Sequence, residues 1–112
     1  DRERVAKYDA DPRCTFLFTD RAAYDFANLV DEVSGARWAA RLPKGKPYLL
    51  VSGDMDPVGN YGAGVKEVYE WMEKAGLDVE LKLYAGARHE LLNEIGRNEI
   101  FDDLFAWIQK RI

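Results

Sequence analysis

Two stretches of the sequence carry side chains that together could move a proton. The first, Gly53–Gly64, contains Asp54 and Asp56, and the second, Ala85–Glu94, contains His89, the only histidine in the chain. A carboxylate that holds an imidazole fixes its tautomer and stabilises the imidazolium, so the other ring nitrogen can take a proton from a nucleophile. An aspartate and a histidine that meet in this way are two of the three members of a nucleophile-activating triad.

Both stretches follow segments with strand patterns. Residues 47–52 are short and almost continuously apolar, which is typical of a strand buried on both faces of a parallel sheet. Residues 79–84 alternate strictly between apolar and polar side chains, which predicts an edge strand with one wetter face. Apolar side chains at helical spacing over residues 65–72, followed by Gly76, predict a crossover helix with a glycine cap. The C-terminal ends of parallel strands share one rim, so the two loops are expected to be neighbours.

Three further helices or helix-like segments are expected. One begins at Thr19 or Asp20, because either side chain can cap the apolar helical pattern that follows. A short helix is expected around Trp38–Leu42, and an amphipathic helix over residues 101–112. Residues 1–18 show no helical periodicity and only a weak extended pattern near their end. The order of strands and helices predicts the α/β class with a parallel sheet.

The composition narrows the function classes. The chain has 112 residues, of which 47% are hydrophobic and 32% charged, so it is expected to be one soluble globular domain. Its net charge of −4 argues against a nucleic-acid partner, whose phosphates favour a basic face. No apolar stretch approaches the length that spans a membrane. The single cysteine, Cys14, cannot form an intramolecular disulfide, which favours a reducing, cytoplasmic location. No motif for a cofactor is found, so none is expected.

The two loops and the spacing between them resemble a known family. Residues 49–59, Leu-Leu-Val-Ser-Gly-Asp-Met-Asp-Pro-Val-Gly, and residues 83–90, Leu-Tyr-Ala-Gly-Ala-Arg-His-Glu, are similar to the C-terminal part of α/β-hydrolases. The branch is that of serine aminopeptidase-like proteins, monoacylglycerol lipases and lysophospholipases. The resemblance implies an incomplete sheet of two parallel strands with flanking helices. Residues 45–112 would be the last β-α-β-α of the core, and residues 1–44 a lid-to-core connection with one or two helices.

The resemblance also implies roles for individual residues. Asp56, the aspartate that precedes Pro57, matches the triad acid, and His89 matches the triad base. Asp54 is the competing acid. If Asp56 is the acid, Asp54 is expected to shape the turn or to accept hydrogen bonds from backbone amides.

The nucleophile of that family is not found in this sequence. The Gly-x-Ser-x-Gly elbow is a strand-turn-helix feature, and Ser34 and Ser52 lack its context. The chain is therefore expected to be the C-terminal fragment of a serine hydrolase, inactive by itself. Its partner would be the upstream part of the same protein, which carries the nucleophilic serine. The parent's substrate would be a small ester or a lipid.

Other interpretations of these residues fit less well. Asp54 and Asp56 resemble the Asp-x-Asp of aspartate-nucleophile phosphatases, but Val58 stands where a threonine is expected. The same loop partly matches an EF-hand, but Val65 occupies the position of the bidentate glutamate. Cys14 lacks the flanking glycines of a nucleophile elbow, and one histidine with scattered acids is no metal-ligand set.

A second hypothesis assigns the chain no chemistry. A hydrolase-like fragment without a nucleophile could act through association, because the strand at residues 47–52 would leave a sheet edge and an apolar face uncovered. This hypothesis predicts a homo-oligomer.

Overall fold

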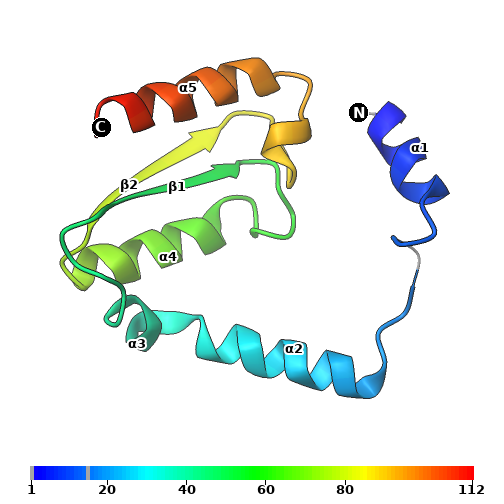
Figure 1. Cartoon of the computed structure of the whole chain (residues 1–112), viewed down its shortest axis with the longest axis horizontal. Coiled ribbons are helices and arrows are strands. Elements are labelled where there is room, and N and C mark those ends of the chain that lie inside the picture. Colours follow the sequence, from blue (N-terminus) through cyan, green and yellow to red (C-terminus); the bar gives the residue numbers. More distant parts are fainter. Residues whose placement is uncertain (1, 15) are drawn as a thin grey trace.

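The computed structural model describes residues 2–14 and 16–112, and its centre is a two-stranded parallel sheet (Figure 1). The elements in chain order are α1 (Arg2–Ala10), α2 (Asp20–Glu32), α3 (Gly35–Ala39), β1 (Pro47–Gly53), α4 (Ala63–Lys74), β2 (Asp78–Tyr84), the 3₁₀ helix η1 (Leu91–Asn93) and α5 (Arg97–Gln109). The strands pair in register from Pro47 opposite Asp78 to Gly53 opposite Tyr84. The predicted α/β class, with two parallel strands and flanking helices in an incomplete sheet, is confirmed.

Helices cover both faces of the sheet, and each face has its own apolar cluster. The cluster on the α4 face contains the buried residues Ala39, Met72 and Leu77, with partly buried side chains from both strands packed against them. The cluster on the α5 face contains the buried residues Tyr84, Ala87, Leu91 and Ile100. Successive strand side chains point to opposite faces, so β1 contributes to both clusters. This two-sided burial explains why the β1 sequence is almost continuously apolar.

The polar side chains of Glu80 and Lys82 in β2 face α5 and are paired there. Lys82 forms an ion pair with Asp103 of α5. The indole Nε1 of Trp107 donates a hydrogen bond to Glu80 Oε1 at 3.0 Å, and Arg111 pairs with the same carboxylate. The wetter face predicted for this strand is therefore covered by a helix that supplies charged partners.

The ends of α2 and α4 follow the predicted capping chemistry. Thr19 caps α2, where its Oγ1 accepts a hydrogen bond from the Ala22 N–H at 3.2 Å. At the end of α4, the Gly76 N–H donates to the Glu73 carbonyl at 2.9 Å and the Leu77 N–H to the Met72 carbonyl at 3.2 Å. This is a Schellman motif, and it needs the left-handed φ of +74° that Gly76 adopts.

The N-terminal third differs from its prediction. Residues 2–10 form helix α1. The sequence shows no apolar periodicity there because the helix buries no residue. Local contacts stabilise it, such as the 2.8 Å ion pair between Lys7 and Glu3. The extended pattern expected near residue 18 does not become a strand in the described residues 16–18, and residue 15 lies outside the description. The short helix expected around Trp38–Leu42 lies three residues earlier, as α3.

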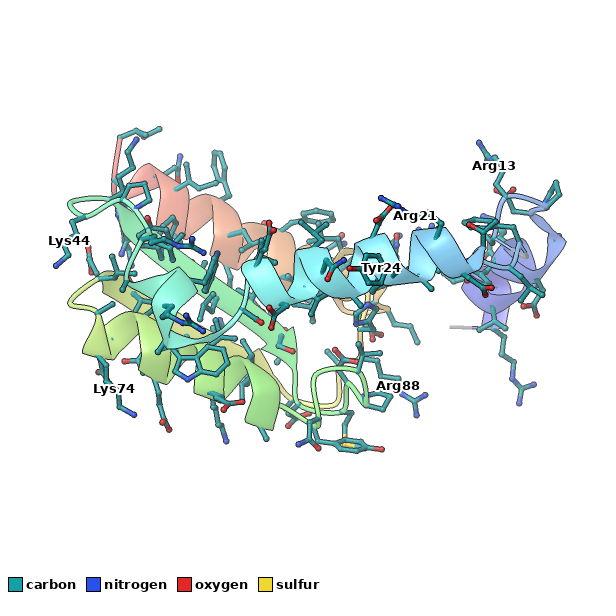
Figure 2. All side chains as sticks on the ribbon, turned by 90° about the horizontal axis from the view of Figure 1, so that it is seen from below. Arg13, Arg21, Tyr24, Lys44, Lys74 and Arg88 are labelled. Atoms are coloured by element: carbon teal, nitrogen blue, oxygen red, sulfur yellow. The ribbon has the colours of Figure 1, made fainter. Side chains whose placement is uncertain are left out.

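The apolar face predicted for α2 exists but is uncovered. Its side chains Phe26, Leu29, Val30 and Val33 are exposed. In Figures 1 and 2, α2 leads away from the sheet, and Arg13 lies at the opposite end of the molecule from Lys44 and Lys74. No helix in the described part of the chain has the length and apolarity to cross a membrane.

The dimensions of the chain also show that it is less compact than a typical domain of its length. The radius of gyration is 16.4 Å, whereas a compact domain of this length has a radius of about 13 Å. The accessible surface is 8702 Å², against about 6300 Å² for a compact monomer of this mass. The excess is surface that a compact domain would bury.

Candidate active site

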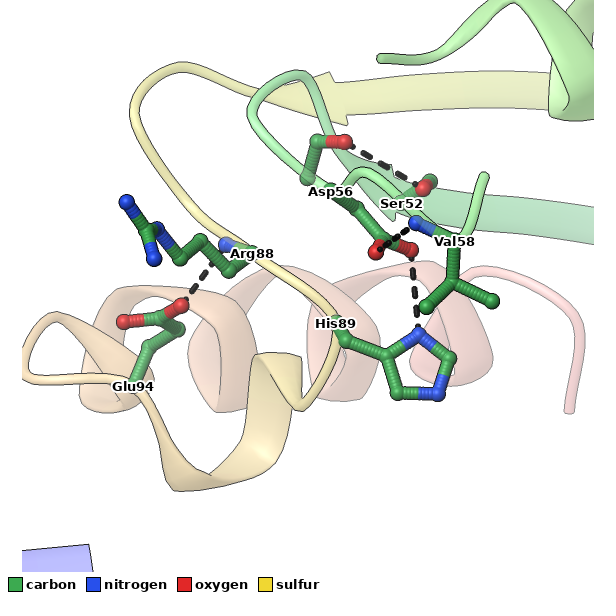
Figure 3. A network of polar contacts seen from close by, with 7 residues as sticks. Ser52, Asp56, Val58, Arg88, His89 and Glu94 are labelled. Atoms are coloured by element: carbon green, nitrogen blue, oxygen red, sulfur yellow. Dashed lines mark hydrogen bonds and ion pairs between the residues drawn. The ribbon is translucent and has the colours of Figure 1, made fainter. Parts of the chain in front are cut away.

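Asp56 and His89 meet at the C-terminal rim of the sheet. His89 Nδ1 lies 3.1 Å from Asp56 Oδ2 (Figure 3), and the two residues belong to the loops that follow β1 and β2. The Asp56 side chain is 8% exposed, whereas that of His89 is 63% exposed. The acid is thus enclosed, and the imidazole stands at the surface. Among the described residues, Nε2 on the other side of the ring has no hydrogen-bond partner.

The surroundings of Asp56 keep its carboxylate ionised. The hydrogen bond with His89 is the largest influence that lowers the pKa of Asp56 below its ordinary value, and the N–H groups of Val58 and Gly59 add to it, while burial acts in the opposite direction. Oδ1 accepts the Val58 N–H at 2.9 Å. An ionised carboxylate can only accept, so Nδ1 must carry the proton in this bond. In the neutral ring, Nε2 is then left as a proton acceptor.

The backbone of the acid loop is tightly turned around Asp56. Asn60 and Tyr61 adopt left-handed φ values of +50° and +53°, which are uncommon for residues other than glycine. This turn brings the Tyr61 N–H to 2.8 Å from the Asp56 carbonyl. The main chain of the acid is thereby fixed together with its side chain.

Asp54, the competing acid of the sequence analysis, binds elsewhere. Its Oδ1 accepts the Gly86 N–H at 2.7 Å, so its carboxylate ties the acid loop to the loop that carries His89. Backbone bonds strengthen the tie, from the Asp54 N–H to the Tyr84 carbonyl at 3.1 Å and from the Met55 N–H to the Ala87 carbonyl at 3.0 Å. The Asp54 carboxylate therefore holds a backbone amide, while that of Asp56 holds the imidazole.

Gly53 makes this contact between the loops sterically feasible, a role that the sequence analysis missed. A Cβ at this buried position would lie 2.1 Å from the Ala87 carbonyl oxygen and 2.6 Å from that of Arg88. No side chain fits at such distances, because the obstacle is backbone. A glycine that ends a strand just before a loop with candidate acids is the signal that could have identified it.

Glu94 was also missed. Its Oε1 accepts the Arg88 N–H at 2.7 Å, as Figure 3 shows, and Arg88 directly precedes His89. A glutamate that binds a loop amide leaves no periodic pattern in the sequence, so nothing there distinguished it from an exposed acid.

The remaining candidates lie outside this pair. Ser52 is part of β1, where its hydroxyl donates to the Gly53 carbonyl at 3.4 Å, and Ser34 precedes α3. Cys14 is a free, partly exposed thiol in the segment between α1 and α2. The described residues contain no group of three or more side chains arranged to hold a metal ion.

Comparison with known proteins relates the chain to hydrolases. The family described as serine aminopeptidase, S33, matches residues 1–96. A highly thermostable carboxyl esterase from Bacillus coagulans, solved in complex with glycerol, is 34% identical with a TM-score of 0.89. A lipase in its open form is 32% identical with a TM-score of 0.84. Each alignment covers 98% of this chain but only 36% of the other protein, so the chain spans about a third of the length of these structures.

Proposed function

The chain belongs to the serine aminopeptidase S33 family of α/β-hydrolases, and from this premise we propose that it supplies the acid and the base of a serine esterase. Asp56 is the acid and His89 the base. The observation that carries the proposal is the 3.1 Å contact between Asp56 Oδ2 and His89 Nδ1, on two loops that share the C-terminal rim of a parallel sheet. Reactive groups gather at that rim in open α/β sheets.

The reaction that this pair supports is acyl transfer. The nucleophilic serine comes from the remaining part of an α/β-hydrolase fold, since these residues contain no Gly-x-Ser-x-Gly. His89 Nε2 takes the serine proton as the serine oxygen attacks the ester carbonyl, and Asp56 stabilises the resulting imidazolium. The imidazolium then protonates the departing alcohol, which leaves a seryl ester. His89 next takes a proton from the water that attacks this ester, and it returns a proton to the serine oxygen as the carboxylic acid is released.

A carboxyl ester is the substrate class that we propose. Support comes from the two similar structures, which are a carboxyl esterase and a lipase. A second argument comes from the apolar segment before and within α2. There the rings of Phe16 and Phe18 pack edge to face with centroids 5.4 Å apart, and Phe26 lies 6.2 Å from Phe18. An acyl chain suits such a segment, so we favour a lipid ester of the lysophospholipid or monoacylglycerol type.

We propose a cytoplasmic location for this enzyme, in keeping with the free thiol of Cys14.

A chimera tests the proposal. Residues 1–112 would replace the matching 36% of the Bacillus coagulans carboxyl esterase, and the purified chimera would be assayed on p-nitrophenyl esters from acetate to palmitate. We expect hydrolysis that His89→Ala abolishes, with higher kcat/KM on the longer esters. Glu90→Ala is the matched control, because Glu90 adjoins His89 but binds only Asn93 among the described residues. A folded chimera whose hydrolysis is insensitive to His89→Ala contradicts the proposal.

A second candidate is a non-catalytic fragment that self-associates. It is favoured by the exposed apolar face of α2 and by the outer edge of β1, which has no strand neighbour in the described part of the chain. The two candidates differ in a simple outcome. A catalytic fragment restores hydrolysis when the rest of the fold is supplied, whereas a purely associative one does not.

A further inference from the structure

In the loop before His89, the backbone of three successive residues is hydrogen-bonded to residues outside the loop. Gly86 donates its N–H to Asp54, and Ala87 accepts the Met55 N–H at its carbonyl. The third residue, Arg88, donates its N–H to Glu94 Oε1 at 2.7 Å. The first two bonds come from the acid loop, and the third comes from the chain segment that leads into α5. The backbone next to His89 is therefore fixed from two sides.

Glu94 is itself held in place. Its N–H donates to the Leu91 carbonyl at 3.2 Å, and its own carbonyl accepts bonds from the Arg97 N–H at 3.2 Å and Arg97 Nη1 at 3.3 Å. The residue is half-buried at the junction between η1 and α5. A bond between an ionised carboxylate and a backbone N–H is stronger than a neutral one. Glu94 thus connects the backbone of the base loop to a helix that packs on the sheet.

We propose that Glu94 is a positioning residue for His89, an inference that rests on the proposed function of the Asp56–His89 pair. By fixing the peptide group between Ala87 and Arg88, Glu94 sets the direction in which the next residue leaves the backbone. The imidazole then reaches Asp56 with Nδ1 and presents Nε2 to the nucleophile. This role matters because His89 is mostly exposed and has little side-chain packing to hold its ring.

The full 112-residue chain offers a direct readout, because its only imidazole signals come from His89. Correlation of ring ¹H and ¹⁵N nuclei by NMR reports which nitrogen carries the proton. In the neutral wild-type ring we expect the Nδ1–H tautomer. Glu94→Ala should lose this signature and give a mixture of tautomers, and Glu94→Gln should retain it because the amide oxygen can still accept from Arg88. Glu90→Ala is the control and should match the wild type.

With folded variants, either of two outcomes overturns the inference. One is a folded Glu94→Ala chain with wild-type imidazole signals, and the other is a Glu90→Ala chain that loses them equally. Asp56→Ala separates this inference from the proposed function, because alanine leaves no oxygen to accept from Nδ1. If Asp56→Ala leaves the tautomer unchanged, the acid–base pair itself is wrong, whereas an effect of Asp56→Ala without one of Glu94→Ala refutes only the role of Glu94. If Glu94→Ala does not fold, amide exchange in the wild type decides: an Arg88 N–H that exchanges as fast as an unbonded loop amide overturns the inference.

Discussion

Asp54 and Asp56 are two residues apart, yet their carboxylates bind different parts of the neighbouring loop. Asp56 holds the ring of His89 at 3.1 Å, and Asp54 holds the backbone N–H of Gly86 at 2.7 Å. One carboxylate thus contacts the group that would carry chemistry, and the other fixes the loop on which that group stands. The two should respond differently to the same substitution.

Replacing each aspartate by asparagine separates these roles in the chimera. Asp56→Asn keeps the shape but removes the charge that stabilises the imidazolium, so kcat should fall by about 10³- to 10⁴-fold. Asp54→Asn keeps an oxygen that can accept the Gly86 N–H, so kcat should stay within about tenfold of the parent. Steady-state kinetics on one p-nitrophenyl ester measures both. Equal losses from the two substitutions would contradict the assignment of Asp56 as the acid.

Gly53→Ala should separate the two loops. The added Cβ would lie 2.1 Å from the Ala87 carbonyl oxygen, so the backbone must move. We expect a loss of about 1–3 kcal/mol in the free energy of unfolding, together with loss of the Nδ1–H signature of His89. Gly96→Ala is the control, because Gly96 has an ordinary φ of −83° and open space where a Cβ would stand. Similar effects at both glycines would refute the steric argument.

Stability should fall in acid through Asp56. Its folded-state pKa lies below the ordinary value of 3.8, chiefly because of the His89 hydrogen bond. Protonation therefore favours the unfolded chain, and the stabilising contribution is present above pH 3.8 and is lost as the pH falls through the folded-state pKa. Urea unfolding at a series of pH values should show a shallower acid decline for Asp56→Asn.

The decline should not vanish in that variant. The pKa of Asp103 is also lowered, mainly by its hydrogen bond with Lys82, so its stabilising contribution is likewise lost as the pH falls. An Asp56→Asn chain with the full wild-type acid dependence would contradict the coupling between Asp56 and His89.

Met72→Ala tests the core on the α4 face. Met72 is 1% exposed, and its side chain packs in the cluster between α4 and the strands. Its truncation should therefore lower the free energy of unfolding by about 2–4 kcal/mol. Met55, the other methionine, is 47% exposed, and Met55→Ala should change stability by no more than about 0.5 kcal/mol. Chemical denaturation compares the two. A small effect at Met72 would mean that this cluster is not the stabilising core.

The isolated chain should self-associate. The apolar face of α2 is exposed, and β1 has an outer edge without a strand neighbour among the described residues. A second copy is available in solution to cover these surfaces. Size-exclusion chromatography with light scattering should give a dimer or a larger species, and Leu29→Glu on α2 should shift it toward monomer. A wild-type chain that stays monomeric at high concentration would contradict this prediction.

The sequence was most informative where burial imposes a pattern. The two strands and α4 were predicted because their side chains face apolar clusters. The C-terminal helix was predicted from its apolar spacing, but α5 begins at Arg97 rather than at residue 101. In it Ile100 and Leu104 face the cluster, whereas Phe101, Phe105 and Ile108 are exposed. Helix α1 was missed because it buries nothing and so leaves no periodicity. The pattern near residue 18 was misleading because apolar alternation makes a strand only where another strand can pair with it.

As with the fold, only part of the candidate site could be predicted from the sequence. Parallel topology places the loops after β1 and β2 on one rim, so Asp56 and His89 were expected to meet, as they do. The choice between Asp54 and Asp56 came from family resemblance, because both carboxylates lie on that rim. Gly53 and Glu94 act on backbone groups, and such contacts depend on loop geometry that residue types and spacing do not specify.

The bonds between the two loops also change how a complete triad would assemble. Three separate groups would have to find one another if acid, base and nucleophile stood on independent segments. Here the loops that carry Asp56 and His89 are already joined by backbone bonds, and the absence of a side chain at Gly53 lets them approach closely. Assembly becomes the docking of two bodies, and a single interface then sets the distance from serine oxygen to imidazole nitrogen. Errors in that docking would change the reaction rate and would leave the contact between Asp56 and His89 intact.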